Sequence, residues 1–370
     1  MDQNNLLSLP IEQKIGQLFF IGLPDTQIDA TGRRLLEEIS PGGVCLFSRN
    51  IQELEQTRQL TDHIREKLPI EPFLGIDQEG GLVDRLRRIS TPMPAANSIK
   101  TVADAENLAQ ITAIILRILG FNLNFAPVVD IIDEKRSRYS NGLYSRAFGR
   151  TAEESFELCE GYLLKLQENG CLGCLKHFPG LGASVIDSHE SLPSVFISES
   201  EFFDTDLFPY REFIKSDRVH AVMVAHAAFP QTELQESDQN GRLLPSSLSF
   251  NFVTKLLRHQ LGFNGLVLTD DLEMGAILNN YGIGDACKLA ITAGEDMLLI
   301  CANPESIREG YAAIKQAVSD GEISEARIDE SLNRIFATKK LLAESIPFDS
   351  TRLQSLSADI AELDKTVKKQ

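Results

Sequence analysis

Short runs of apolar residues alternate along the chain with longer amphipathic segments. Eight of these runs have the length and the β-prone composition of buried strands. They cover Leu18–Ile21, Gly43–Phe47, Phe73–Ile76, Phe121–Phe125, Leu172–Lys176, Ala221–Val224, Leu266–Thr269 and Met297–Cys301. Because the runs are continuously apolar, the pattern predicts a parallel sheet that is covered by helices on both faces.

The amphipathic segments end at the signals that commonly stop helices. Ala152–Glu168 runs into Asn169-Gly170, Phe252–Leu261 into Gly262, and Ala286–Ala293 into Gly294. After the eighth strand, Ile328–Leu342 is expected to form a closing helix.

Eight strand–helix units indicate an α/β fold of the (β/α)8 barrel type in a single domain. An open, doubly wound sheet is the competing architecture, and the lack of a Gly-x-Gly-x-x-Gly turn after the first strand disfavours it. We expect residues 1–345 to form the catalytic barrel domain. Residues 346–370 are expected to form a polar C-terminal tail that is rich in lysine at its end.

Polar side chains gather where the predicted strands end. In a barrel the active site lies at the carboxyl ends of the strands, so these residues should converge. The residues at or just beyond the strand ends are Asp77, Asp130, Lys176, His177, His226, Asp270 and Asp271.

Net charge, apolar runs and cysteine content limit the partners, the cellular location and the cofactors that we expect. The 370 residues carry a formal net charge of −17, which argues against nucleic acid or an anionic membrane surface as a main partner. No apolar run approaches membrane-spanning length, and the first residues lack a signal-peptide pattern. The six cysteines lie mostly in apolar segments, and Cys171-x-x-Cys174 lacks a second pair for a zinc site. We therefore expect a reducing, cytoplasmic setting, no metal and no cofactor.

The segment from Lys176 to His189 carries the most specific chemistry. It starts at a strand end, passes through the Pro/Gly-rich turn Pro179–Gly182 and closes on Asp187-Ser188-His189. An aspartate beside a histidine can orient the imidazole and tune its basicity, which suits a general acid/base. Together with a carboxylate at another strand end, such as Asp270, the pair would satisfy the needs of retaining glycoside hydrolysis.

Several blocks of the chain resemble the bacterial β-N-acetylglucosaminidases of glycoside hydrolase family 3. The blocks are Gly42–Ile51, Gly75–Gly81, Asn124–Asp130, Arg146–Gly149, Lys176–Gly180, Asp187–His189 and Thr269–Met274. They follow the order of the family from residue ~15 to residue ~300 and cover almost every strand end. The resemblance implies a single barrel that hydrolyses terminal, non-reducing GlcNAc from muropeptide fragments during cell-wall recycling.

The resemblance also implies roles for individual residues. Asp270 matches the nucleophile of the family, His189 its acid/base, and Asp187 the partner of that histidine. Five further residues match those that hold the hydroxyl groups of the sugar: Asp77, Arg85, Arg146, Lys176 and His177. The chain departs from the family at Leu181 and Leu82, where histidine and arginine are usual. We expect Leu181 to position its loop by apolar contacts, with Val185 or Ile186.

Other readings of these residues remain open. Asp270 could cap the following helix, although Asp271 is the better candidate for that role. Glu79 is assigned to a structural turn, and Asp130 and His226 to holding loops. Two rival functions are a β-glucosidase-like hydrolase of the same family and a catalytically silent glycan-binding barrel.

Overall fold

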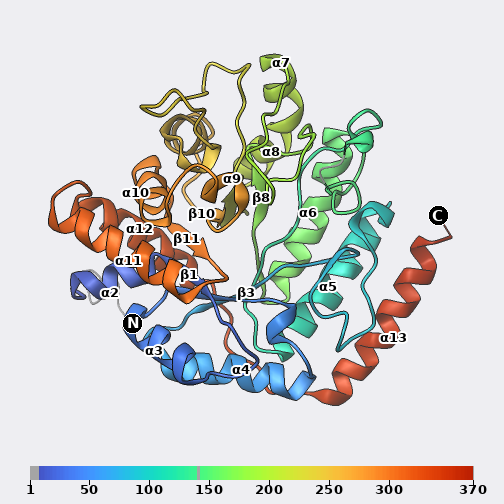
Figure 1. Ribbon diagram of the computed structural model, residues 1–370. Coiled ribbons are helices and arrows are strands. Elements are labelled where there is room, and N and C mark those ends of the chain that lie inside the picture. The colour runs from blue at the N-terminus through green and yellow to red at the C-terminus, as the bar shows by residue number, and fades with distance from the viewer. Residues whose placement is uncertain (1–7, 140–141, 370) are drawn as a thin grey trace.

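The computed structural model describes residues 8–139 and 142–369, which form a closed barrel of parallel strands surrounded by helices (Figure 1). The strands of the barrel are β1 (Phe19–Gly22), β2 (Gly43–Leu46), β3 (Phe73–Ile76), β6 (Leu123–Asn124), β7 (Leu172–Gly173), β8 (Leu175–Phe178), β9 (Ala221–Val224), β10 (Leu266–Asp271) and β11 (Met297–Ile300). Each lies within or overlaps one of the eight apolar runs, so the expected strands are all present.

The sheet contains nine strands because the fifth apolar run is divided in two. Strand β7 pairs with β6, whereas β8 pairs with β9, and only Cys174 separates the two halves. The barrel is joined on its other side by β1, which pairs in parallel with both β2 and β11. The structure therefore confirms the (β/α)8 barrel.

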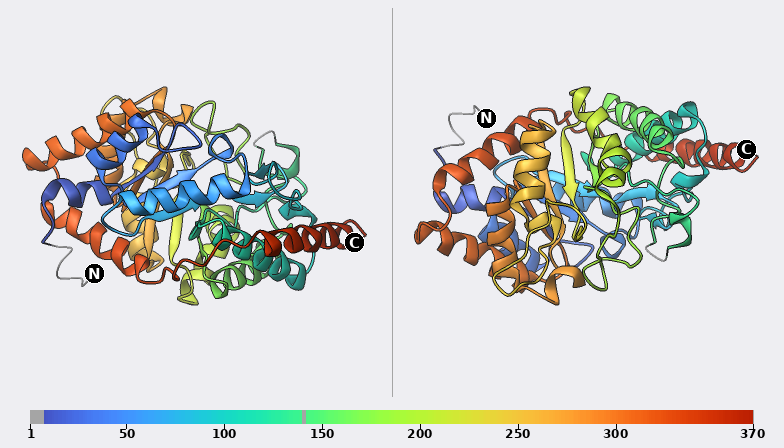
Figure 2. Two further views of the ribbon diagram at one scale, coloured as in Figure 1. Left: turned by 90° about the horizontal axis from the view of Figure 1, so that it is seen from below. Right: turned by 90° about the horizontal axis from the view of Figure 1, so that it is seen from above.

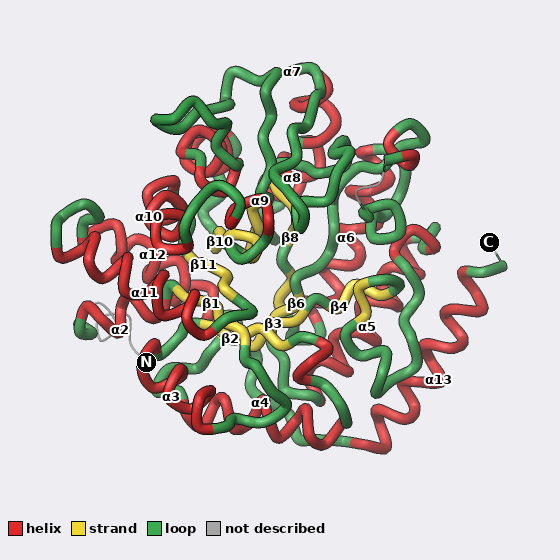
Figure 3. The backbone as a smooth tube through the Cα atoms, viewed as in Figure 1, coloured by secondary structure: helices red, strands yellow, loops and turns green. Residues whose placement is uncertain are grey.

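Helices form the outer layer, and in Figure 3 the strands gather at the centre of the molecule. The helices are α2 (Ile11–Gln17), α3 (Ala30–Ile39), α4 (Leu54–Lys67), α5 (Val102–Ile118), α6 (Ala152–Glu168), α7 (Glu199–Glu201), α8 (Phe208–Lys215), α9 (Gly275–Leu278), α10 (Ile283–Ala293), α11 (Pro304–Ser319), α12 (Glu325–Lys339) and α13 (Ser350–Val367). Helix α6 has the predicted bounds, and α10 and α12 begin three residues earlier than expected. Within the described ranges, no helix is both long and apolar enough to cross a membrane.

Two segments differ from the expectation. The segment expected as Phe252–Leu261 is a π-helix, Asn251–Gln260, which still ends just before Gly262.

The predicted C-terminal tail contains the long helix α13, whose N-cap Asp349 accepts a hydrogen bond from the backbone N–H of Arg352 at 2.8 Å. The helix extends along the outside of the barrel next to α5 (Figure 2). Five apolar side chains spaced at helical intervals are buried beneath it: Leu353, Leu356, Ile360, Leu363 and Val367.

Candidate active site

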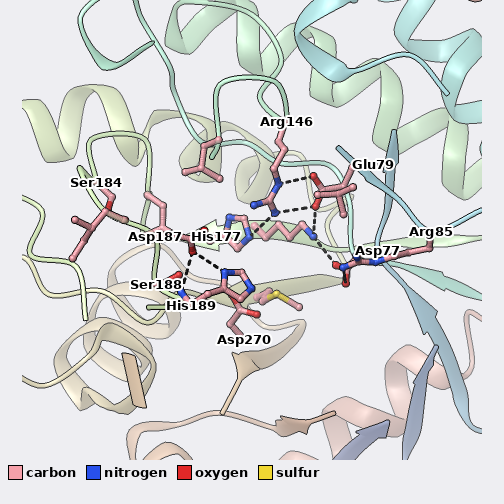
Figure 4. Close-up of a pocket in the computed structure, with 16 residues that line it drawn as sticks. Asp77, Glu79, Arg85, Arg146, His177, Ser184, Asp187, Ser188, His189 and Asp270 are labelled. Carbon is pink, nitrogen blue, oxygen red and sulfur yellow. Dashed lines mark hydrogen bonds and ion pairs between the residues drawn. The ribbon is translucent and has the colours of Figure 1, made fainter. Parts of the chain in front are cut away.

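One pocket lies at the carboxyl ends of the strands, and all eight residues predicted to be catalytic or to bind the sugar line it. They are Asp77, Arg85, Arg146, Lys176, His177, Asp187, His189 and Asp270. In Figure 4 the Asp187–His189 pair lies on one side of this pocket, and Asp77, Glu79 and Arg85 lie on the other. Residues from the ends of four barrel strands, β3, β6, β8 and β10, or from the loops that follow them, therefore meet in one place.

A tight hairpin brings Arg85 back to Asp77. Strands β4 (Gln78–Gly80) and β5 (Val83–Asp84) are antiparallel; Gly80 ends β4 and Gly81 begins the turn between them. Both glycines have positive φ angles, of 92° and 58°, which other residues rarely adopt. A side chain at Gly80 would also clash with the carbonyl oxygen of Pro94. The hairpin tip leaves Leu82 at 70% exposure, while Val83 lines the pocket.

Asp77 is held ionised by two cations. Its carboxylate accepts from Lys176 Nζ at 2.7 Å and from Arg85 Nη2 at 3.3 Å. Burial alone would raise the pKa of Asp77, but the charges of Lys176 and Arg85 outweigh burial and keep that pKa well below its usual range. The pKa of Lys176 is raised despite its burial, because Asp77 and Glu79 surround it. Lys176 and the adjacent His177 are joined by a cis peptide bond.

Glu79, which the sequence assigned only to a structural turn, lies in the hairpin strand β4 and also lines the pocket. Arg146 donates to both of its carboxylate oxygens, at 2.8 and 3.0 Å, and Lys176 Nζ lies 2.6 Å away. These charges overcome the effect of burial and lower the pKa of Glu79 to about 2. The sequence did carry a signal for this role. Glu79 follows Asp77 at the i+2 position of an extended segment, and the three cations predicted for the pocket need more than one carboxylate.

Asp130 holds two parts of the pocket at once. One of its oxygens lies 2.8 Å from His177 Nδ1, and the other accepts from the backbone N–H of Leu181 at 2.6 Å. Because a carboxylate only accepts, His177 carries its proton on Nδ1 and presents Nε2 toward Arg146, 3.4 Å away. The loop-holding role expected for Asp130 agrees with these contacts.

The turn after β8 rests on a buried ion pair. Arg136 donates to both oxygens of Asp206 at 2.8 Å, and both side chains are almost fully buried. A side chain at Gly180 would lie 2.8 Å from Cβ of Asp206, so the turn can approach the pair only because Gly180 lacks one. Leu181 is buried and lines the pocket. Val185, one of the two residues expected to pack against it, is half-exposed. The polar anchor of the turn is therefore its backbone contact with Asp130.

The Asp187–His189 pair stands at the solvent side of the pocket. Asp187 Oδ1 accepts from both the backbone N–H and Nδ1 of His189, at 2.9 and 2.7 Å. Partial burial would raise the pKa of Asp187, but these two hydrogen bonds from His189 hold it below its usual value. Since Nδ1 donates to Asp187, Nε2 of His189 is the nitrogen that can exchange a proton with a bound molecule.

The two carboxylates at the end of β10 have different surroundings. Asp270 lines the pocket and accepts from the backbone N–H of Asp271 at 2.8 Å. Asp271 turns away from the pocket lining and accepts from the backbone N–H of Glu273 at 3.0 Å. Burial, followed by the charges of Glu273 and Asp270, raises the pKa of Asp271 to about 7. Nearby, His226 donates from Nε2 to the carbonyl of Asp271 and accepts at Nδ1 from Ser247, so it supports this strand end.

These groups supply what the cleavage of a glycosidic bond requires. A pocket lined by carboxylates, guanidinium groups, an ammonium and imidazoles offers both donors and acceptors to a polyhydroxylated ligand. A carboxylate at a strand end and an oriented imidazole provide the two reactive groups. No group of three or more His, Cys, Asp or Glu residues within the described ranges is arranged to hold a metal ion. The fold and the site are those of a glycoside hydrolase.

Comparison with known proteins identifies the family. The chain belongs to glycosyl hydrolase family 3, whose N-terminal domain model matches residues 10–338. Two relatives named β-hexosaminidase, from Psychromonas ingrahamii and Pseudomonas aeruginosa, are each 33% identical over 283 and 298 residues. These matches cover 74% and 79% of this chain, and 80% and 84% of the relatives. The protein is thus a glycoside hydrolase of the β-N-acetylhexosaminidase type, as the resemblance predicted.

Solved structures agree with this assignment. The family 3 β-N-acetylglucosaminidase of Paenibacillus sp. str. FPU-7 superposes with a TM-score of 0.86 at 33% identity, covering 96% of this chain and 69% of that one. NagZ of Neisseria gonorrhoeae, solved in complex with N-trifluoroacetyl-D-glucosamine, has a TM-score of 0.75 at 25% identity. That match covers 94% of this chain and 98% of NagZ.

Proposed function

We propose that this enzyme is a retaining exo-β-N-acetylglucosaminidase. Asp270 attacks the anomeric carbon and forms a covalent glycosyl-enzyme, while His189 donates a proton from Nε2 to the departing oxygen. The same nitrogen then takes a proton from the water that releases the sugar. Asp187 stabilises the imidazolium form through its hydrogen bond with Nδ1.

One observation carries this proposal. Asp270 in β10 and the Asp187–His189 pair on the loop after β8 are about 80 residues apart in the chain, yet they line the same pocket. Asp271, the rival carboxylate, is not among the residues that line it, and the rise in its pKa to about 7 weakens it as a nucleophile near neutral pH.

The sugar is bound by the other side of the pocket. We assign its hydroxyl groups to Asp77, Arg85, Arg146, Lys176 and His177, because these side chains offer hydrogen-bond donors and acceptors in one pocket. Glu79 keeps Arg146 and Lys176 charged and in place.

The proposed substrates are muropeptide and other peptidoglycan fragments with a terminal, non-reducing GlcNAc, consumed during cell-wall recycling. The names of the relatives and the N-acylglucosamine ligand of the gonococcal NagZ support the N-acetylated sugar. A cytoplasmic location belongs to the same proposal, and the six buried, unpaired cysteines are compatible with its reducing conditions.

Hydrolysis of a chromogenic β-GlcNAc, compared with the matching β-glucoside, tests the proposal directly. We expect preference for β-GlcNAc, loss of turnover in Asp270→Ala, and labelling of Asp270 by a slow 5-fluoro sugar. Preference for the glucoside would favour the β-glucosidase-like alternative. Binding of GlcNAc oligomers without any turnover would favour the silent glycan-binding barrel, and labelling of Asp271 or Asp77 would overturn the assigned nucleophile.

A further inference from the structure

The loop that carries Asp187 and His189 is fastened to the short helix that follows Asp270. The backbone N–H groups of Gly275 and Ala276 donate to the carbonyls of His189 and Ser188, at 3.2 and 3.1 Å. Residues at the start of a helix have no intrahelical acceptor for these N–H groups, so the loop supplies the missing partners of α9. The side-chain amide of Asn279 adds a third contact, 3.0 Å from the carbonyl of Glu190.

This contact requires a glycine at position 275. A Cβ atom there would lie 2.6 Å from the carbonyl oxygens of both His189 and Glu190. Both atoms belong to the backbone, so neither could give way unless the loop moved. Gly275 begins an ordinary α-helix, and its φ angle is open to any residue. Glycine is therefore required at position 275 because the loop lies too close to the helix for a side chain, and not because of its backbone conformation.

Helix α9 is in turn tied to the barrel. Leu272 donates from its N–H to the carbonyl of Leu299, at 2.9 Å, just after the end of β10. The carboxylate of Glu273 accepts from the backbone N–H groups of Ala302 and Asn303, which follow β11. The surface on which the loop rests is thus continuous with the strand that ends in Asp270.

We infer that Gly275 and Asn279 are positioning residues that set the height of His189 over the sugar relative to Asp270. This inference rests on the proposed function, because it assigns a geometric role within the same reaction. A loop lifted from α9 would carry Nε2 of His189 away from the leaving oxygen, while Asp270 would keep its place. The loss should therefore fall on proton donation and spare nucleophilic attack.

The test compares Gly275→Ala and Asn279→Ala with the wild type on aryl and alkyl β-GlcNAc substrates of graded leaving-group pKa. His189→Ala should slow poor leaving groups by about 100-fold or more, and Gly275→Ala by about tenfold, with activated aryl glycosides within about threefold. Asn279→Ala should act in the same direction by about threefold. The rate at which an activated fluorosugar labels Asp270 should stay unchanged in both variants.

Gly282→Ala is the matched control, because a Cβ atom there would meet its nearest neighbour at 3.8 Å. The positioning role is refuted if Gly275→Ala behaves like Gly282→Ala. It is also refuted if Gly275→Ala and Asn279→Ala slow substrates with all leaving groups equally. In either case the proposed hydrolysis stands. Asn279 is exposed, so its variant folds independently of any clash at position 275. A wild type inactive on every β-GlcNAc substrate would instead refute the proposed function and this inference with it.

Discussion

Among the single residues of the pocket, Glu79 pairs with two cations at once. It shares Arg146 and Lys176 with the pocket and is itself almost fully buried. Removing one member of a buried ion pair leaves its partner uncompensated, which typically costs ~3–5 kcal/mol.

Replacing Glu79 by Gln should therefore destabilise the fold by roughly 3 kcal/mol and raise KM, because Arg146 and Lys176 lose their shared anion. Urea denaturation and steady-state kinetics would measure the two effects. Glu168→Gln is the control, since its pair with Lys165 is exposed and should contribute less than about 1 kcal/mol. An equal, small effect of both substitutions would show that Glu79 is not a structural anion of the pocket.

Glu295 is another buried carboxyl group, outside the pocket, two residues before β11 begins. Neither of its oxygens has a hydrogen-bond partner within the described part of the chain. Burial, and then the charge of Asp296, raise its pKa well above the usual value, against the opposing charges of Arg258 and Arg327. Folding therefore favours the protonated form of this side chain.

A raised pKa in the folded state gives stability that is full below the unfolded pKa of ~4.3 and declines as the pH rises toward the folded value. Glu295→Gln cannot ionise, so its stability relative to the wild type should increase as the pH rises above the unfolded pKa of ~4.3. Each unit of pKa shift corresponds to ~1.4 kcal/mol. Chemical denaturation at several pH values would measure the difference in stability between Glu295→Gln and the wild type. Glu330→Gln, at an exposed position, is the control. A difference that does not vary with pH would contradict the neutral state.

The residues of the pocket differ in how far sequence could predict their place. Asp270, His189 and Lys176 stand at strand ends or on an irregular loop, which is where a barrel places its active-site residues. Glu79 was missed because it lies inside a short hairpin strand, where a carboxylate has several ordinary uses. Asp130 contacts His177 and Leu181 across 47 and 51 residues of sequence, and a local sequence pattern contains no sign of such distant contacts.

At the scale of elements, α13 is a helix that the polar composition of its segment did not reveal. Its polar and lysine-rich residues suggested a tail, yet Leu353, Leu356, Ile360 and Leu363 follow helical spacing and are buried. The strands were easier to predict, since a buried parallel strand is apolar along its whole length. The π-helix Asn251–Gln260 could not be anticipated, because its amphipathic pattern is also that of an α-helix.

Leu356→Ala should destabilise the protein by ~2–5 kcal/mol, because Leu356 is almost fully buried under α13. Its activity at a temperature where it is folded should match the wild type, since α13 contributes no residue to the pocket. Thermal unfolding measures the change, and Gln354→Ala on the exposed face is the control. A stable Leu356→Ala variant would mean that α13 is only loosely attached.

At the scale of the whole molecule, the charge of −17 acts on any anionic substrate before it reaches the pocket. Raising the ionic strength from ~10 mM to ~150 mM shortens the screening length from ~30 to ~8 Å. Under the proposed function, kcat/KM for a GlcNAc substrate with a carboxylated aglycone should then rise by about two- to fivefold. A neutral aryl substrate should not respond. The same response from both substrates would assign the effect to the pocket itself.

The pairing of β1 with β11 also sets the order in which the protein can be completed during synthesis. Phe19 pairs with Leu298, so the first described strand to leave the ribosome gains this partner only when the last one, β11, has been synthesised. Until then both edges of the growing sheet remain open, and open edges invite pairing with other chains. A nascent chain of this enzyme is therefore exposed to misassembly for most of its translation, and a chaperone that shields sheet edges would act on it before β11 emerges.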